Sequence, residues 1–320
     1  MGETGKTGLT LAQEYINENK MLKNGERIKF VFSDGMGGAK TSLNALNYLL
    51  EVQKCGAIFS IVSTVDLAIL PVQKTKRFLF VTHATHPALS GVDPLFFRHS
   101  PTVEQEFKII SNHIKSTNVN KVVLLTMTDD YGAVFRDRFL QNNLIPAQNV
   151  FSFTLDERDY KVSCAKAVSL LPSIIILCGN GRDLYKVILT LNELNYKKEV
   201  VTTLGFKVGG AYEKVKNMPN ITYMDFKKVK INAIFSSVID SYRKKYGRDI
   251  NVNEMIFFNS ALMLVDAINK TKYPRDWNEV ARNLSMIKKF EGVGETITVN
   301  TSNDILPNLE LVETKEVDQK

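Results

Sequence analysis

The chain has 320 residues, of which 44% are hydrophobic and 23% are charged, and its formal net charge is +7. This length predicts two lobes rather than one, and the scattered basic residues argue against a nucleic-acid-binding surface. No apolar run reaches the roughly 18 residues that a membrane span requires.

Short apolar segments alternate with segments of helical periodicity along almost the whole chain. The apolar segments predict strands at residues 28–33, 57–63, 78–82, 95–99, 121–127, 149–153, 173–178, 200–204, 221–226, 295–299 and 309–313. The periodic segments predict helices at residues 8–19, 40–54, 103–117, 132–143, 160–170, 182–195, 229–246, 253–270 and 276–285. A further helix begins near Asp66, and we expect Pro71 to end or kink it.

Nearly all-apolar strands joined by helices are typical of parallel sheets covered on both faces. Ten or more strands exceed an ordinary single sheet, whereas two sheets of about five strands are common. We therefore predict an α/β protein of two lobes, with the chain crossing between them near residues 98–101, 225–228 and 290–294. The predicted lobes are residues 1–99 with 226–290, and residues 100–225 with 291–320.

The segment from Phe78 to Gly91 is the most informative part of the sequence. Its apolar strand ends in a loop of small and hydroxyl residues that includes Thr82 and Thr85. In open α/β sheets, ligands bind outside the carboxyl ends of the strands. Hydroxyl and free backbone N–H groups at this place suit the carboxylate of a small molecule. The sequence therefore indicates a receptor that closes around a solute, and not an enzyme.

The chain resembles the type I periplasmic binding proteins, specifically the branched-chain amino-acid (Leu/Ile/Val) receptor family of ABC importers. The segments that carry the resemblance are GLTLAQEYIN (8–17), VTHATHPALSG (81–91), LFFRHSPT (95–102), VVLLTMTDDYG (122–132), the pair Asp159–Tyr160, SYRKKYGRDINVNEMIFFNSALMLVDAI (241–268) and FEGVGETITVN (290–300). The resemblance implies two flavodoxin-like (Rossmann-like) lobes, three hinge strands, and a ligand cleft between the lobes.

The resemblance also implies which residues bind the solute. Backbone and hydroxyl groups of the first lobe are expected to hold a carboxylate and an amine, and a tyrosine of the second lobe is expected to close over the ligand. The implied ligand-binding positions are Ser63, Thr64, His83, Ala84, Thr85, Tyr131, Asn180 and Gly205. No catalytic residue, metal or cofactor is expected.

Two features depart from the family pattern. The acidic residue that commonly receives the ligand's ammonium group is missing, because Gly205 stands at or near its position. This departure favours a solute without an amino group. The alternative is that another acidic residue, Glu254 or Asp225, binds the ammonium group. In addition, the family's first strand and turn precede the position of Gly2, so we expect the natural precursor to carry them behind a signal peptide.

Three other patterns have structural explanations. GETGKT (2–7) is too short for a phosphate-binding loop and no strand precedes it. His83 and His86 have no Cys, Asp or Glu close in sequence that would complete a metal site. Asp129 and Asp130 precede a helix, where Asp caps backbone N–H groups, so capping is favoured over acid–base chemistry.

The sequence and the resemblance together predict an extracytoplasmic solute-binding protein, periplasmic or at the cell surface, that delivers its solute to ABC permease subunits at the membrane. The expected solute is an amino acid or a related organic acid. The alternative is a domain of the same fold that senses a ligand for a regulatory or signalling partner. An α/β enzyme is a third hypothesis, but the chain lacks a G-x-S-x-G elbow around Ser63 and a phosphate loop.

Overall fold

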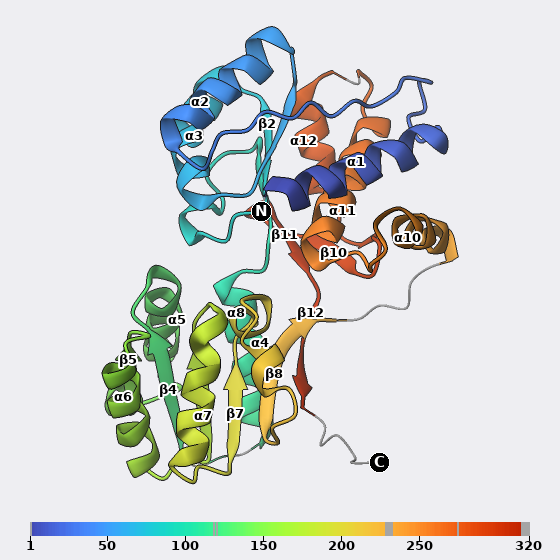
Figure 1. Cartoon of the computed structure of the whole chain (residues 1–320). Helices are drawn as coiled ribbons and strands as arrows, with labels where there is room; N and C mark the ends of the chain where they lie inside the picture. The colour runs from blue at the N-terminus through green and yellow to red at the C-terminus, as the bar shows by residue number, and fades with distance from the viewer. Residues whose placement is uncertain (1, 118, 120, 228–232, 274, 315–320) are drawn as a thin grey trace. The chain divides into compact units, whose positions relative to one another are not determined.

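The computed structural model describes residues 2–117, 119, 121–227, 233–273 and 275–314. The chain divides into two compact units, each built from two separate stretches of sequence (Figure 1). Unit 1 comprises residues 1–101 and 228–308, and unit 2 comprises residues 102–227 and 309–320.

The chain passes between the units three times, as predicted. The first two passages lie within two residues of the expected lobe boundaries at 99–100 and 225–226. The third was expected at residues 290–294 and lies at 308–309 instead, so that part of the prediction is wrong. The reason is that residues 291–308 contribute strands to the sheet of unit 1.

The sheet of unit 1 has six strands in the order β1 (Ala57–Ser60), β2 (Leu79–Thr82), β3 (Phe96–His99), β11 (Asp304–Pro307), β10 (Thr296–Val299) and β9 (Phe290–Glu291). The first four are parallel, and β10 and β9 are antiparallel to their neighbours. Its helices are α1 (Gly2–Glu18), α2 (Ala39–Asn47), α3 (Ser63–Lys76), α10 (Ala233–Tyr246), α11 (Val252–Asn269) and α12 (Trp277–Ser285), with a π-helix η1 (Tyr48–Val52) after α2 and a 3₁₀ turn η2 (Pro87–Leu89).

The sheet of unit 2 has the order β12 (Leu309–Glu313), β8 (Ile221–Phe226), β7 (Glu199–Thr202), β6 (Ile174–Cys178), β4 (Val122–Met127) and β5 (Val150–Phe153). Only β12 is antiparallel to its neighbour. Its helices are α4 (Val103–Thr117), α5 (Asp130–Gln141), α6 (Glu157–Ser169), α7 (Tyr185–Glu193), α8 (Leu204–Val208) and α9 (Tyr212–Val215), with 3₁₀ turns η3 (Ala147–Asn149) and η4 (Arg182–Leu184). Each unit is therefore α/β with a mostly parallel sheet, as predicted, and with antiparallel strands at one edge.

Helix α11 lies at the centre of the core of unit 1. It is apolar on nearly all sides, which is typical of a helix that is buried all round. Phe258 packs into a cluster with α1 and α10, whereas Met263 packs into a second cluster with the sheet and α12. A reciprocal capping box between Asn251 and Glu254 satisfies backbone donors at its start.

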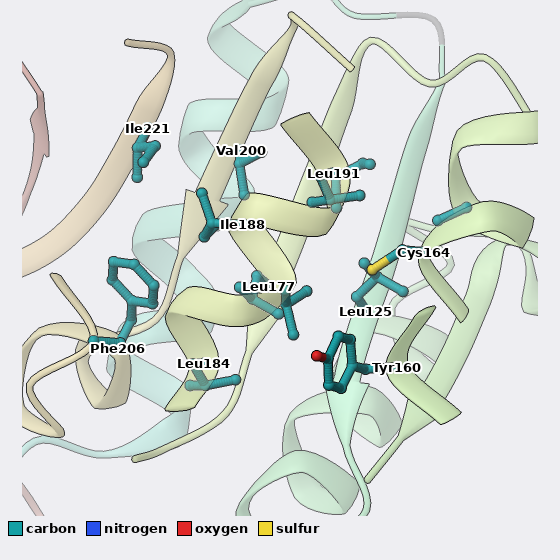
Figure 2. Packing of buried hydrophobic residues seen from close by; sticks show 14 of the residues in the cluster. Leu125, Tyr160, Cys164, Leu177, Leu184, Ile188, Leu191, Val200, Phe206 and Ile221 are labelled. Carbon is teal, nitrogen blue, oxygen red and sulfur yellow. The ribbon is translucent and has the colours of Figure 1, made fainter. Parts of the chain in front are cut away.

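Helices cover both faces of the unit 2 sheet. Alternate residues of β4 point to opposite faces, as the period of a strand requires. Leu125 packs with α6 and α7, as Figure 2 shows, whereas Leu124 packs with α4 and α5. In Figure 2 the side chains of Tyr160 and Cys164 from α6 face those of Leu177 and Ile188. This double covering explains why the strands of unit 2 are almost wholly apolar.

Residues 28–33 form no strand, so this prediction is wrong. The N–H of Ile28 donates to the side chain of Asn17 at 2.9 Å, and the N–H of Phe30 donates to Gln13 at 2.6 Å. Side chains of α1 thus accept the hydrogen bonds that backbone N–H groups of this segment would otherwise donate to a neighbouring strand. An alternating apolar pattern makes a strand only where another strand pairs with it.

Smaller differences concern helices. Pro71 does not end α3, which continues to Lys76. The GETGKT segment lies within the first turns of α1, so it forms no loop. The first residues of the helix expected at 229–246 lie outside the described residues, and α10 is described from Ala233.

Candidate functional site

Ser63 and Thr64 begin helix α3, directly after β1. The N-cap residue Val62 makes no side-chain cap, and the first helical N–H with a helix-type partner is that of Asp66, bonded to the carbonyl of Val62 at 2.9 Å. The N–H groups of the first three helical residues have no acceptor within the helix. Ser63 is half-buried and Thr64 is exposed. Such a helix start, with the positive end of the helix dipole, suits a carboxylate.

Asp66 joins this helix start to the loop after β2. The hydroxyl of Thr82 donates to Asp66, and the backbone N–H of Ala84 donates to the same hydroxyl at 2.9 Å. Asp66 is fully buried, and burial raises its pKa to about 6, although hydroxyl groups of Ser60 and Thr82 act in the opposite direction. The sequence reasoning missed this role. An acid among apolar residues in a first helical turn was the available signal.

The three predicted residues after β2 have different surroundings. Thr85 is exposed, whereas Ala84 is buried and can offer only backbone groups. The side chain of His83 was expected to line the ligand site, but it points into the core of unit 1. Its ring centroid lies 3.7 Å from that of Phe257, and its Nε2 lies 3.0 Å from Ser260 Oγ. Burial lowers the pKa of His83 to about 3, so the ring is neutral.

The buried side chain of Arg98 holds the loop that contains Thr85. Its Nη1 donates to the carbonyl oxygens of Thr85 and His86, at 3.3 and 3.0 Å. Its Nε donates to Asp304 Oδ1 at 2.8 Å, and both side chains of this ion pair are almost completely buried. The pair fixes the backbone that presents Thr85, although neither charged group is itself exposed.

A buried polar cluster lies between β3, α11 and the segment before β10. Ser260 Oγ lies 2.6 Å from His99 Nδ1, and Asn259 donates to Glu295 Oε1 at 2.7 Å. His99 Nε2 is 3.8 Å from the same carboxylate oxygen. Burial lowers the pKa of His99 and raises the pKa of Glu295 to about 7. The cluster belongs to the interior of unit 1, so it forms no part of the surface of the site.

Tyr131 of unit 2 stands at the start of α5, after β4. The cap of this helix is Asp129, which accepts a hydrogen bond from the N–H of Gly132 at 2.7 Å, so the capping role predicted for Asp129 is confirmed. The Tyr131 hydroxyl donates to Glu106 Oε1 at 2.8 Å. The partly buried ring is therefore held by its polar end, and what remains for a ligand is ring surface.

Asn180 and Gly205 lie next to each other, after β6 and β7. Asn180 is exposed, and Gly205 is half-buried. A Cβ atom on Gly205 would lie only 2.3 Å from the carbonyl oxygen of Gly179. Glycine is required here because two backbone segments meet, so no acidic side chain can occupy this position.

The two acids considered as replacements are bonded within the protein. Glu254 accepts from Arg248 at 2.6 Å and from the Tyr242 hydroxyl at 2.7 Å, and it belongs to the capping box of α11. Asp225 pairs with Lys207. Both therefore have structural roles, and neither is an unpaired acceptor for a ligand's ammonium group.

Within the described residues, no group of three or more His, Cys, Asp or Glu side chains is arranged to hold a metal ion. In the same part of the chain, no helix combines the length and the apolar character needed to cross a bilayer.

Comparison with known proteins adds two findings. A family model described as periplasmic binding protein matches residues 1–308. No curated protein sequence matches the chain.

Three solved structures illustrate the similarity of fold. The branched-chain amino acid transporter substrate-binding protein LivJ of Streptococcus pneumoniae, in complex with isoleucine, is 19% identical, with a TM-score of 0.77 over 98% of this chain and 91% of that one. A branched-chain amino acid ABC transporter periplasmic ligand-binding protein of Burkholderia xenovorans is 17% identical, with a TM-score of 0.83 over 98% and 87%. An ABC transporter solute-binding protein of Rhodopseudomonas palustris, in complex with 3,4-dihydroxybenzoic acid, is 15% identical, with a TM-score of 0.72 over 99% and 89%.

Proposed function

We propose, from the premise that this chain belongs to the periplasmic binding protein family, that it is the solute-binding component of an ABC importer. It captures a small carboxylate-bearing solute outside the cytoplasm and delivers it to membrane permease subunits. Binding makes and breaks no covalent bond.

The observation that carries this proposal is the uncapped start of α3 beside the exposed Thr85. Unpaired N–H groups and exposed hydroxyl groups of Thr64 and Thr85 form a set of donors at the carboxyl ends of two adjacent strands. Asp66 and Arg98 hold the two loops from inside the unit. Donors fixed before binding suit an anionic group, because little conformational entropy is lost when the solute arrives.

The proposed solute class depends on whether an acidic side chain is free to bind the ammonium group of an amino acid. A carboxylate partner gives an α-amino group a charge-assisted hydrogen bond that contributes about 1.5–3 kcal/mol. Gly205 cannot carry one, and Glu254 and Asp225 are engaged elsewhere. This favours an organic acid without an amino group over an amino acid. The Rhodopseudomonas palustris protein with its bound dihydroxybenzoic acid illustrates that this fold accommodates such a solute.

A thermal-shift and calorimetric comparison of leucine, isoleucine, benzoate and 3,4-dihydroxybenzoate tests the proposal. A ligand that binds only the folded state at 100 times its Kd stabilises the protein by about 2.7 kcal/mol, so a clear rise in Tm is expected. We expect the aromatic acids to bind more tightly than the amino acids, and Thr85→Val to weaken binding. The absence of any shift at millimolar concentration of all four compounds would contradict the proposal.

A further inference from the structure

One buried carboxylate connects two segments of unit 2 that carry predicted solute positions. Glu106 belongs to α4 and is only 3% exposed. Its Oε1 accepts from the hydroxyl of Tyr131 at 2.8 Å, and its Oε2 accepts from the backbone N–H of Leu204 at 2.8 Å. Tyr131 follows β4, and Leu204 follows β7 and directly precedes Gly205. Three elements thus meet at a single side chain.

Stability alone does not explain a carboxylate at this position. In the described part of the chain Glu106 forms no ion pair, whereas Glu104, two residues earlier, pairs with Arg138 in an exposed position at 3.1 Å. A buried carboxylate without a cation is costly, and an apolar residue of similar volume would usually serve the core as well or better. The two oxygens are instead used to fix two separate groups.

We propose that Glu106 is a positioning residue for solute binding: it sets the orientation of the Tyr131 ring and the backbone position of Leu204 and Gly205 at the same time. The inference rests on the proposed function of the preceding section. It also assigns Tyr131 a defined role, because a hydroxyl bonded to Glu106 leaves the ring, and not the hydroxyl, to contact the solute.

The ionised carboxylate is the form that accepts from both partners at once. Burial raises the pKa of Glu106 to about 7, and the hydrogen bonds from Leu204 and Tyr131 act in the opposite direction. The titratable groups that interact with it are Tyr131 and Cys178, the pKa values of both being raised mainly by burial. Asp129 in turn acts on Cys178. Solute affinity is therefore higher above pH 7 than below it.

The test uses the variants Glu106→Leu, Glu106→Gln and Tyr131→Phe, with whichever of benzoate, 3,4-dihydroxybenzoate, leucine and isoleucine binds the wild type most tightly. Loss of both hydrogen bonds in Glu106→Leu is expected to raise the Kd about 10- to 100-fold. Glutamine has the hydrogen-bonding pattern of the protonated carboxyl, accepting from Leu204 and donating to Tyr131, so Glu106→Gln is expected to bind at every pH as the wild type binds below pH 7. Adding Tyr131→Phe to Glu106→Leu causes little further loss, because the two groups are coupled.

Two matched controls separate positioning from general destabilisation. Glu104→Gln changes an exposed acid on the same helix. Glu199→Gln removes a carboxylate that accepts from Thr222 at 2.6 Å and lies 2.9 Å from His113 Nε2, at the opposite end of β7. Both controls are expected to keep the wild-type Kd. If Glu106→Leu binds like the wild type, or if Glu199→Gln loses as much affinity, the positioning role is wrong.

A measurement without solute distinguishes failure of this inference from failure of the proposed function. Glu106→Leu should speed hydrogen exchange at the Leu204 amide at least tenfold, and Glu106→Gln should restore protection. If the wild type binds none of the four compounds, the proposed function fails, and the exchange result alone decides whether Glu106 holds this loop. Unchanged exchange in Glu106→Leu would overturn the inference.

Discussion

The two units hold the loops at the carboxyl ends of their strands in different ways. Unit 1 uses several buried polar groups, among them the Arg98–Asp304 ion pair, Asp66 and the cluster around Glu295. Unit 2 uses the carboxylates of Asp129 and Glu106, and close contact between backbone segments at Gly205. The supports of unit 1 include a buried ion pair, whereas the buried carboxylate Glu106 of unit 2 is held by hydrogen bonds from uncharged groups. Loss of one group should have different consequences in the two units.

The largest expected effect is in unit 1. Arg98→Leu leaves Asp304 as a buried charge without its cation, so the free energy of unfolding should fall by about 3–5 kcal/mol. Urea denaturation measures this loss. The double variant Arg98→Leu with Asp304→Leu should recover much of it, because no unpaired charge remains. A loss below about 1 kcal/mol in the single variant would show that the pair is not the main support of this loop.

In unit 2, Gly205→Ala is the corresponding test. Its Cβ would lie 2.3 Å from the carbonyl oxygen of Gly179, so the backbone must shift, at a cost of about 1–3 kcal/mol. Gly2→Ala is the control, since nothing lies within 4 Å of a Cβ at that position. Denaturation curves of both variants give the comparison. Equal stability of the two variants would mean that the backbone contact at Gly205 is unimportant.

The pH dependence of stability compares the two units directly. Glu295 and Glu106 both have pKa values raised to about 7, above those of an unfolded chain. Each therefore contributes stability that is complete below the unfolded pKa and lost as the pH rises through about 7. The free energy of unfolding of Glu295→Gln and of Glu106→Gln, measured relative to the wild type, should each rise by on the order of 1–3 kcal/mol between pH 5 and pH 8.

Differences from the wild type at each pH isolate this contribution, because His83 and His99 act in the opposite direction. Their lowered pKa values cost stability as the pH falls below the unfolded value, and both histidines are present in both variants. Because His99 lies 3.8 Å from Glu295, Glu106→Gln gives the cleaner difference. The exposed Glu157, whose pKa is lowered by Lys161, serves as control, and Glu157→Gln should show no such gain. A flat difference for Glu295→Gln would mean that this carboxyl is ionised throughout.

The smallest expected effect concerns the exposed pair Glu104–Arg138. Both side chains are about half exposed, so Glu104→Gln should change the free energy of unfolding by no more than about 0.5 kcal/mol. Glu106 lies on the same helix but is buried, so the two residues compare an exposed acid with a buried one. A change as large as that of Arg98→Leu would mean that exposure is a poor guide to the importance of acids in this protein.

The sequence predicted the regular part of the fold well. The apolar segments that became β4, β6 and β8 lie at the expected places, because a strand buried on both faces must be apolar at almost every position. It failed at 28–33, where the pattern was present but no partner strand was, and it missed the short strands β9 and β11. Pairing is a property of distant segments, so local pattern does not reveal it.

For the candidate site, the sequence predicted residues on the loops but not the buried residues that hold those loops, such as Asp66. Thr85 could be proposed because hydroxyl residues after an apolar strand are visible in the sequence, whereas Ser63 and Thr64 were proposed from the resemblance to the family. Whether they bind a solute is a prediction for the binding experiments. The inward direction of the His83 side chain could not be seen, since it depends on Phe257 and Ser260, far away in the sequence.

By itself, the sequence determined the α/β class, the two-lobed organisation and the loops that end the strands, because periodicity and polarity are written residue by residue. Only the tertiary structure decided that residues 291–308 belong to unit 1, that Gly205 must lack a side chain, and that Glu106 meets Tyr131 and Leu204. The physical reason is that hydrogen bonds and close contacts of this kind join residues that are far apart in the chain. They exist only after the sheets and helices have packed.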